Sequence, residues 1–169
     1  PLLIKTGLIH AKKQTVSSLS KGMRNRVNFC RALLKDVQIL YLDEPTSGLD
    51  PATTEKIHEL ILEERKKGTA VFLTTHNMYE AQKLCDNILL LNNGTIIEQG
   101  KPEDICLKYN QKNVMTLTLK DGKKLVFPNA PAYAAHVARL IQEEQITSIH
   151  SSEPTLEQVF LHLTGRSLL

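Results

Sequence analysis

The stretch ILYLDEPTSGLDP, residues 39–51, indicates the fold class of this chain. A short apolar run is stopped there by two adjacent carboxylates, Asp43 and Glu44, and by a proline. Such a run is typical of a strand buried on both faces of a parallel sheet. Carboxylates at a strand exit are costly to bury unless they meet a cation or a reacting proton. Taken alone, the pair could equally form a turn or cap a helix.

A helix and a second strand follow this stretch. Asp50 is a good N-cap, Pro51 suits the first helical position, and basic residues precede Gly68, so residues 50–68 are predicted to be helical. The apolar run AVFLTTH, residues 70–76, predicts a second buried strand. Strand, helix and strand in this order favour an α/β layer arrangement.

The second predicted strand ends in His76. Open α/β sheets bind their ligands at the carboxyl ends of the strands, so we expect His76 to lie near Asp43 and Glu44. A histidine at this position can donate a hydrogen bond to a phosphate oxygen. A lone histidine is more often an ordinary core or surface residue, and only the order and spacing of these residues together favour a phosphate site.

The segment SLSKGMRNR, residues 18–26, predicts a helix start suited to an anion. Ser20 is a good N-cap, Gly22 allows a ligand close to the backbone, and cationic side chains follow. The phosphate-binding pattern G-x-x-x-x-G-K-[ST] does not occur in the chain. Gly-Lys is found only at 100–101 and 122–123, and neither pair is followed by Ser or Thr.

Four ordered stretches resemble the C-terminal half of an ABC-type ATPase domain. They are LSKGMRNRVNFCRALL, ILYLDEPTSGLDP, VFLTTH and CDNILLLNNGTIIEQG, which match the signature motif, the Walker B motif with the D-loop, the switch histidine and the closing hairpin. The match covers about residues 16–105. The resemblance implies an α/β fold, a partial P-loop NTPase core that lacks its Walker A half.

The signature differs from the common L-S-G-G-Q form, since Lys21 replaces the first glycine and Met23 the glutamine. The S-K-G-M form resembles the variant frequent in ABC-2-type exporter ATPases, including drug, peptide-antibiotic and bacitracin-resistance systems. The final stretch EPTLEQVFLHLTG, residues 153–165, is similar to the closing helix of many of those proteins.

The resemblance implies a role for each matching residue. Asp43 would help to hold Mg²⁺, Glu44 would orient or deprotonate the attacking water, and His76 would contact the γ-phosphate. The signature would close over ATP bound to a second protomer, and the D-loop would shape the dimer interface. The residues implied are catalytic Glu44 and His76, metal-binding Asp43, and cofactor-binding Ser20, Lys21, Gly22, Met23 and Asp50. Lys21 could equally be a solvated residue at a helix start.

The resemblance therefore implies an ATP-hydrolysing subunit of an ABC-type membrane exporter. Its partners would be a second ATPase protomer, head to tail, and a transmembrane permease, at the cytoplasmic inner face of the cell membrane. ATP and Mg²⁺ are expected only in the intact protein, because the chain looks truncated and is expected to be inactive alone. The alternatives are a soluble ABC-family ATPase and a degenerate regulatory or scaffold module.

Composition excludes some classes of protein. The 21 basic and 18 acidic residues are interspersed, aromatics are 5% and there is no Trp, which argues against a nucleic-acid module. The three cysteines have no zinc-ligand spacing, and no apolar run approaches the roughly 18 residues of a membrane span.

Two parts are expected along the chain. Residues 1–109 would be the C-terminal part of the ABC ATPase domain, and residues 110–169 a small α+β accessory domain. The elements predicted after residue 85 are a hairpin at 87–100, a helix at 102–109, a second hairpin at 113–129, a helix at 131–145, a strand at 146–152 and a helix at 153–165.

Overall fold

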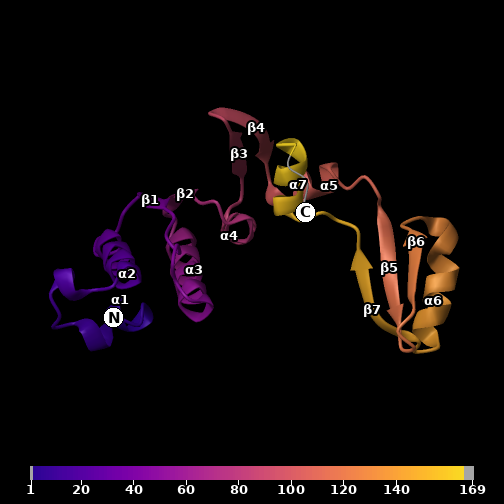
Figure 1. The fold of residues 1–169 in the computed structure, drawn as a ribbon, viewed down its shortest axis with the longest axis horizontal. Helices are drawn as coiled ribbons and strands as arrows, with labels where there is room; N and C mark the ends of the chain where they lie inside the picture. Colours follow the sequence, from indigo (N-terminus) through magenta and orange to yellow (C-terminus); the bar gives the residue numbers. More distant parts are fainter. Residues whose placement is uncertain (1, 166–169) are drawn as a thin grey trace. The chain divides into compact units, whose positions relative to one another are not determined.

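The structure, a computed structural model, describes residues 2–165 of the chain (Figure 1). Along the chain it divides into two compact units, with the division between Cys85 and Asp86. The boundary expected from the sequence lies later, after residue 109. Within the second unit, helix α5 (Pro102–Lys108) contacts both strand β4 (Thr95–Gly100) and helix α7 (Leu156–Leu163). The assignment of 110–169 as an accessory domain stays a prediction.

The first unit contains one parallel strand pair with helices. Its elements are α1 (Leu2–Lys5), the 3₁₀ helices η1 (Ile9–Ala11) and η2 (Val16–Ser18), α2 (Lys21–Ala32), β1 (Ile39–Asp43), α3 (Pro51–Lys66), β2 (Ala70–Thr74) and α4 (Met78–Leu84). The predicted helix start at residues 18–26, the two predicted strands and the helix predicted at 50–68 are confirmed, with α3 ending at Lys66 and β2 at Thr74.

Strands β1 and β2 are parallel, and α3 connects them (Figure 1). Their register runs from Ile39 opposite Ala70 to Asp43 opposite Thr74. The pairing continues one residue further, because the backbone N–H of Glu44 donates to the carbonyl of Thr74 at 2.9 Å. The two strands therefore end at the same edge of the sheet, as the sequence predicts.

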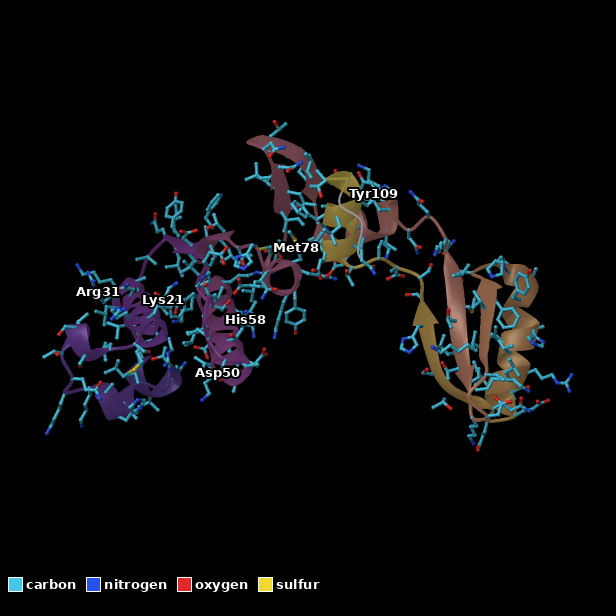
Figure 2. All side chains as sticks on the ribbon, in the orientation of Figure 1. Lys21, Arg31, Asp50, His58, Met78 and Tyr109 are labelled. Carbon is cyan, nitrogen blue, oxygen red and sulfur yellow. The ribbon has the colours of Figure 1, made fainter. Side chains whose placement is uncertain are left out.

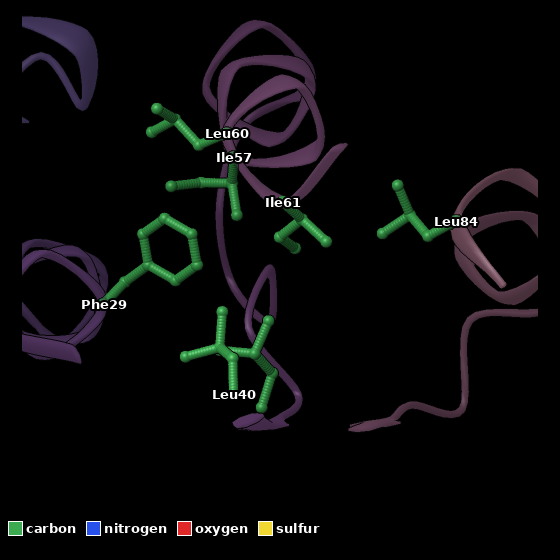
Figure 3. Close-up of a cluster of buried hydrophobic side chains, with 7 residues drawn as sticks. Phe29, Leu40, Ile57, Leu60, Ile61 and Leu84 are labelled. Atoms are coloured by element: carbon green, nitrogen blue, oxygen red, sulfur yellow. The ribbon is translucent and has the colours of Figure 1, made fainter. Parts of the chain in front are cut away.

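The core of this unit lies on one face of the strand pair (Figure 3). Its members are Phe29 of α2, Leu40 and Leu42 of β1, Ile57, Leu60 and Ile61 of α3, and Leu84 of α4. Burying an aliphatic or aromatic side chain of this size contributes about 1.5–3 kcal/mol each. This cluster is what holds α2, α3 and α4 against the strands.

The other face of the strand pair is exposed. Tyr41 is 71% exposed, Phe72 is 55% exposed, and their ring centroids lie 5.7 Å apart. The expectation that both strands are buried on both faces is therefore wrong for this chain, because within residues 2–165 only one face is covered. The uncovered face leaves apolar side chains exposed.

The second unit contains two antiparallel sheets. Its elements are β3 (Ile88–Asn92), β4 (Thr95–Gly100), α5, β5 (Val114–Leu119), β6 (Lys124–Pro128), η3 (Pro131–Tyr133), α6 (Ala134–Gln142), β7 (Ile146–Ser151) and α7. Strands β3 and β4 form the predicted hairpin, and their turn has positive φ at Asn93 (49°) and Gly94 (76°). The three-stranded sheet has the order β6-β5-β7.

Helix α6 packs on the three-stranded sheet through aromatic contacts. The ring centroids of Phe127 on β6 and His136 on α6 lie 5.3 Å apart. The helix predicted at 131–145 is shorter than expected, since it begins as the 3₁₀ helix η3 and α6 ends at Gln142, just before the left-handed Glu144 (φ 51°). Among residues 2–165, no helix has the length and apolarity that crossing a membrane requires.

Candidate active site

The carboxyl ends of β1 and β2 bring polar side chains together. Asp43 and Thr74 are opposite each other at the last pair of the register, and the Thr74 hydroxyl donates a hydrogen bond to the Asp43 carboxylate. Parallel strands align their carboxyl ends, so residues 31 apart in the sequence meet here. Thr74 fixes the orientation of Asp43.

Glu44 turns away from the strand and contacts His76. Its φ of 47° lies in the left-handed region, which is unfavourable for a residue with a Cβ and is found where the surrounding structure enforces it. Oε1 of Glu44 accepts the backbone N–H of His76 at 2.9 Å and lies 2.7 Å from its Nδ1. The two adjacent carboxylates thus have different partners, which is compatible with the separate roles that the resemblance implies for them.

The contact between Glu44 and His76 constrains the histidine tautomer. An ionised carboxylate only accepts hydrogen bonds, so Nδ1 carries a proton when the pair is in contact. Nε2 then donates to a phosphate oxygen only if the imidazole is protonated there as well. The His76 side chain is 82% exposed and Glu44 is 35% exposed, so a ligand can reach both. The pair can orient a water molecule and meet an anionic phosphate.

Asp43 fits the chemistry of a magnesium site. Mg²⁺ in nucleotide sites is held by one or two carboxylates, and substrate phosphates and water supply its other ligands. Among residues 2–165 there is no group of three or more His, Cys, Asp or Glu side chains that could hold a metal. Asp43 would therefore be a single protein ligand, which is compatible with Mg²⁺ bound together with a nucleotide.

The predicted signature residues form the start of α2. Ser20 is the N-cap, and its side chain accepts the backbone N–H of Met23 at 3.2 Å, as its residue type predicts. Lys21 is exposed at the first helical position (Figure 2). The side-chain cap uses one of the free N–H groups at this helix end, and the others remain oriented toward the N-terminal side.

The start of α2 lies against the D-loop. A Cβ built on Gly22 would lie 3.2 Å from Cδ2 of Leu49 and 3.5 Å from the carbonyl oxygen of Gly48. Gly48 has a φ of 73°, in the left-handed region that glycine adopts without a steric penalty. The structure therefore brings the predicted signature and the D-loop together, although they are more than twenty residues apart.

Asp50 is the N-cap of α3 in this structure (Figure 2). Its Oδ1 accepts the backbone N–H of Thr53 at 3.0 Å. The side chain of Thr53, followed by its backbone N–H, holds the pKa of Asp50 below its ordinary value. The helix-capping interpretation of Asp50 is confirmed, and its role at a dimer interface stays a prediction.

Comparison with known proteins identifies the family. Residues 5–81 match a family model described as "AAA domain, putative AbiEii toxin, Type IV TA system". A fluoroquinolones export ATP-binding protein of Mycobacterium tuberculosis (strain CDC 1551 / Oshkosh) is 34% identical over 175 residues, which cover 99% of this chain and 57% of that protein. Nod factor export ATP-binding protein I of Bradyrhizobium diazoefficiens is 33% identical over 189 residues, covering 99% and 60%. The chain belongs to the ABC transporter ATP-binding proteins.

A solved ABC ATPase confirms the fold. A dimeric ATP-binding cassette in a post-hydrolysis state with ADP and Pi superimposes with a TM-score of 0.54 at 29% identity, covering 59% of this chain and 44% of that chain. The fold is part of the P-loop NTPase core of an ABC ATPase, as the resemblance implies. The chain spans about 57–60% of the length of the two curated relatives named above.

A buried polar cluster in this ABC-family chain was not predicted from the sequence. Oε1 of Glu80 accepts the hydroxyl of Thr46 at 2.8 Å and lies 3.1 Å from Nε2 of His58. Glu80 has no exposed surface, and His58 on α3 is 1% exposed (Figure 2). Asn77 caps α4 by accepting the Glu80 N–H, while the Glu80 side chain turns into the interior.

Proposed function

We propose that this chain provides the catalytic carboxylate, the switch histidine and the signature helix of an ATP-hydrolysing subunit of an ABC exporter. The observation that carries the proposal is the contact of Glu44 with His76 beside Asp43, at the carboxyl ends of two parallel strands. Phosphoryl transfer depends mostly on positioning and on charge stabilisation, so this small set of groups is sufficient on the protein side.

Each of these residues has a proposed role in hydrolysis. The Glu44 carboxylate orients the attacking water and accepts its proton, and the imidazole of His76 contacts the γ-phosphate. Asp43 holds Mg²⁺, which supplies positive charge to the phosphates when it is bound. The hydrogen bond from Thr74 keeps the Asp43 carboxylate in place for this role.

The signature helix is proposed to act on the nucleotide of a second protomer. The helix begins with the four residues Ser20, Lys21, Gly22 and Met23. Its free N–H groups and its dipole favour an anion. The contact of Gly22 with the D-loop supports a shared surface for the signature and Asp50. The dimeric form of the similar cassette supports a head-to-tail partner.

The export names of the relatives support a transmembrane permease as the second partner and a position at the cytoplasmic face of the membrane. These relatives are named for chemically different cargoes, a fluoroquinolone and a Nod factor, so the proposal extends to export and to no particular cargo. We also infer that the chain alone neither binds ATP tightly nor hydrolyses it, because its sequence contains no G-x-x-x-x-G-K-[ST] loop.

The test uses the complete protein that carries this chain, assembled with its membrane partner in lipid vesicles. Glu44→Gln should lower kcat for ATP hydrolysis by about a hundredfold or more, because it removes the base but keeps the shape of the side chain. Glu59→Gln, which changes an exposed glutamate on α3, is the matched control and should leave kcat unchanged. Equal activity of the two variants would overturn the proposed role of Glu44.

A further inference from the structure

The segments that carry Glu44 and His76 are joined a second time inside the protein. At the surface, His76 contacts the Glu44 carboxylate directly. In the interior, the hydroxyl of Thr46 donates to Oε1 of Glu80 at 2.8 Å. Thr46 follows Glu44 by two residues and Glu80 follows His76 by four, so the two contacts connect the same two segments.

The interior contact is rigidly supported. Glu80 has no exposed surface and Thr46 is 9% exposed. The backbone N–H of Glu80 donates to Oδ1 of Asn77 at 3.2 Å, and Asn77, directly after His76, is the N-cap of α4. His58 of α3 approaches the same Glu80 oxygen at 3.1 Å and fixes the carboxylate from a third element. The chain and the two hydrogen bonds therefore form a closed loop, which leads from Glu44 to Thr46, across to Glu80, back along the chain to His76 and across to Glu44.

The surface contact alone is weakly constrained. The His76 side chain is 82% exposed, and an exposed pair gains little because water competes for both groups and the side chains lose entropy. A buried contact has no such competition, so it restricts the separation of the two segments more strongly. Of these two side-chain contacts, the Thr46–Glu80 hydrogen bond is thus the stronger constraint, and it acts in addition to the backbone pairing that ends with the Glu44 N–H on the Thr74 carbonyl.

Stability of the fold does not by itself explain the buried cluster of Thr46, His58 and Glu80. Within residues 2–165, Oε2 of Glu80 and Nδ1 of His58 have no hydrogen-bond partner. Oε2 of Glu55 lies 3.8 Å from Nδ1 of His58, beyond hydrogen-bond distance. Buried polar atoms without partners lower stability, and apolar side chains of similar volume would pack here at lower cost. What the cluster does provide is a fixed geometry between two segments.

We propose that Glu80 is a positioning residue for ATP hydrolysis. Through Thr46, its carboxylate holds the turn after β1 against the start of α4, and this keeps the two surface residues in contact. The inference rests on the proposed function for its effect on catalysis. The structural link itself is independent of that function, and the two parts are tested separately.

The variants are Thr46→Val and a matched control, Thr69→Val. Valine has the shape of threonine and lacks its hydroxyl. Thr69 is 8% exposed, close to the exposure of Thr46, and its hydroxyl donates to the Val37 carbonyl at 3.1 Å beside the opposite end of β2. Each variant removes the hydrogen bond of one buried threonine hydroxyl in the same unit, so a merely structural role predicts similar results for both. Thr46→Ser keeps the hydroxyl and is the rescue variant.

The first measurement is hydrogen exchange at the His76 amide, followed by NMR in the purified chain. Thr46→Val should accelerate this exchange by about tenfold relative to the unaltered chain, because the hydrogen bond of the amide to Glu44 opens more often. Thr69→Val and Thr46→Ser should leave the rate within about twofold. An unchanged rate in Thr46→Val, or an equal change in the Thr69→Val control, would overturn the structural link.

The second measurement is ATP hydrolysis by the complete protein assembled with its membrane partner. Thr46→Val should lower kcat by about tenfold with little change in KM for ATP, and Thr46→Ser should restore kcat. If Thr46→Val accelerates exchange at the His76 amide and leaves kcat unchanged, the proposed role of Glu80 in catalysis is wrong, although the structural link exists. If the unaltered protein hydrolyses no ATP, the proposed function fails, and the exchange measurement still decides whether Glu80 holds the two segments together.

Discussion

His76 contacts Oε1 of Glu44 through two of its nitrogen atoms, the backbone N–H at 2.9 Å and the imidazole Nδ1 at 2.7 Å. The two residues are 32 positions apart and are brought together because β1 and β2 are parallel and end in register. Glu44, whose backbone is in the left-handed region, thus has its carboxylate oriented by His76, the residue proposed to contact the γ-phosphate. This coupling has consequences that can be measured.

Glu44 and His76 should act as one unit in hydrolysis. We expect Glu44→Gln and His76→Ala each to lower kcat strongly, and the double variant to lie within about threefold of the more impaired single variant. The reason is that each substitution already disrupts the arrangement on which the other residue depends. Steady-state ATPase rates of the complete protein check this. Losses that multiply in the double variant would show that the two residues act independently.

Gly22→Asp should separate nucleotide binding from hydrolysis. A carboxylate at the start of α2 would repel a phosphate approaching that helix end, so ATPase activity of the complete protein should be abolished. Binding of ATP at a single site, measured by fluorescent-nucleotide titration, should remain within about twofold, because the signature is proposed to serve the partner's nucleotide.

Gly22→Ala is the control for this substitution. Its Cβ would meet only the flexible end of Leu49 at 3.2 Å and the Gly48 carbonyl at 3.5 Å, so it tests the steric effect without the charge. We expect most of the ATPase activity to remain. An equal fall in binding and hydrolysis for Gly22→Asp would mean that the helix serves the nucleotide of its own chain.

The exposed face of β1 and β2 should make the purified chain self-associate. Tyr41 and Phe72 present adjoining aromatic rings to solvent, and exposed apolar surface of this kind favours association. Replacing both, by Tyr41→Thr and Phe72→Thr, should lower the mean mass in sedimentation velocity. Tyr79→Thr removes an aromatic ring that is 66% exposed on α4 and should change little. A monomeric unaltered chain would contradict the prediction.

Glu98 should make the second unit sensitive to acid. Lys108 donates to its carboxylate at 2.6 Å and Tyr109 at 2.7 Å, and these hydrogen bonds lower the pKa of Glu98 from 4.5 to about 2. A carboxyl whose pKa is lower in the folded state stabilises that state above its unfolded pKa. The contribution is therefore complete above about pH 4.5 and is lost as the pH falls toward 2.

The substitution that tests this is Glu98→Gln. It should destabilise the unit by about 1 kcal/mol at pH 7, a modest value because the Lys108 side chain is 60% exposed. Urea unfolding followed by circular dichroism should show the difference from the unaltered chain shrinking between pH 4.5 and 2. The exposed Glu103, changed to glutamine, is the control. A difference that does not vary with pH would contradict the assignment.

The sequence determined the features that depend on neighbouring residues. Ser20 and Asp50 cap helices as predicted, and residues 87–100 contain the predicted hairpin, which is closed by the Asn93–Gly94 turn. These outcomes follow from hydrogen bonds and backbone conformations that a few adjacent residues decide. The order of the motifs also determined the family, since each motif is a short local pattern.

Only the tertiary structure decided which distant residues touch and which faces are covered. The exposure of Tyr41 and Phe72 depends on what packs over the strands, which the apolar run around them does not encode. The cluster of Thr46, His58 and Glu80 joins residues up to 34 positions apart, and its burial results from the packing of α3 and α4. Glu80 illustrates the difference: its backbone N–H takes part in a local helix cap with Asn77, but its carboxylate finds its partners, Thr46 and His58, in the interior because packing removes it from water.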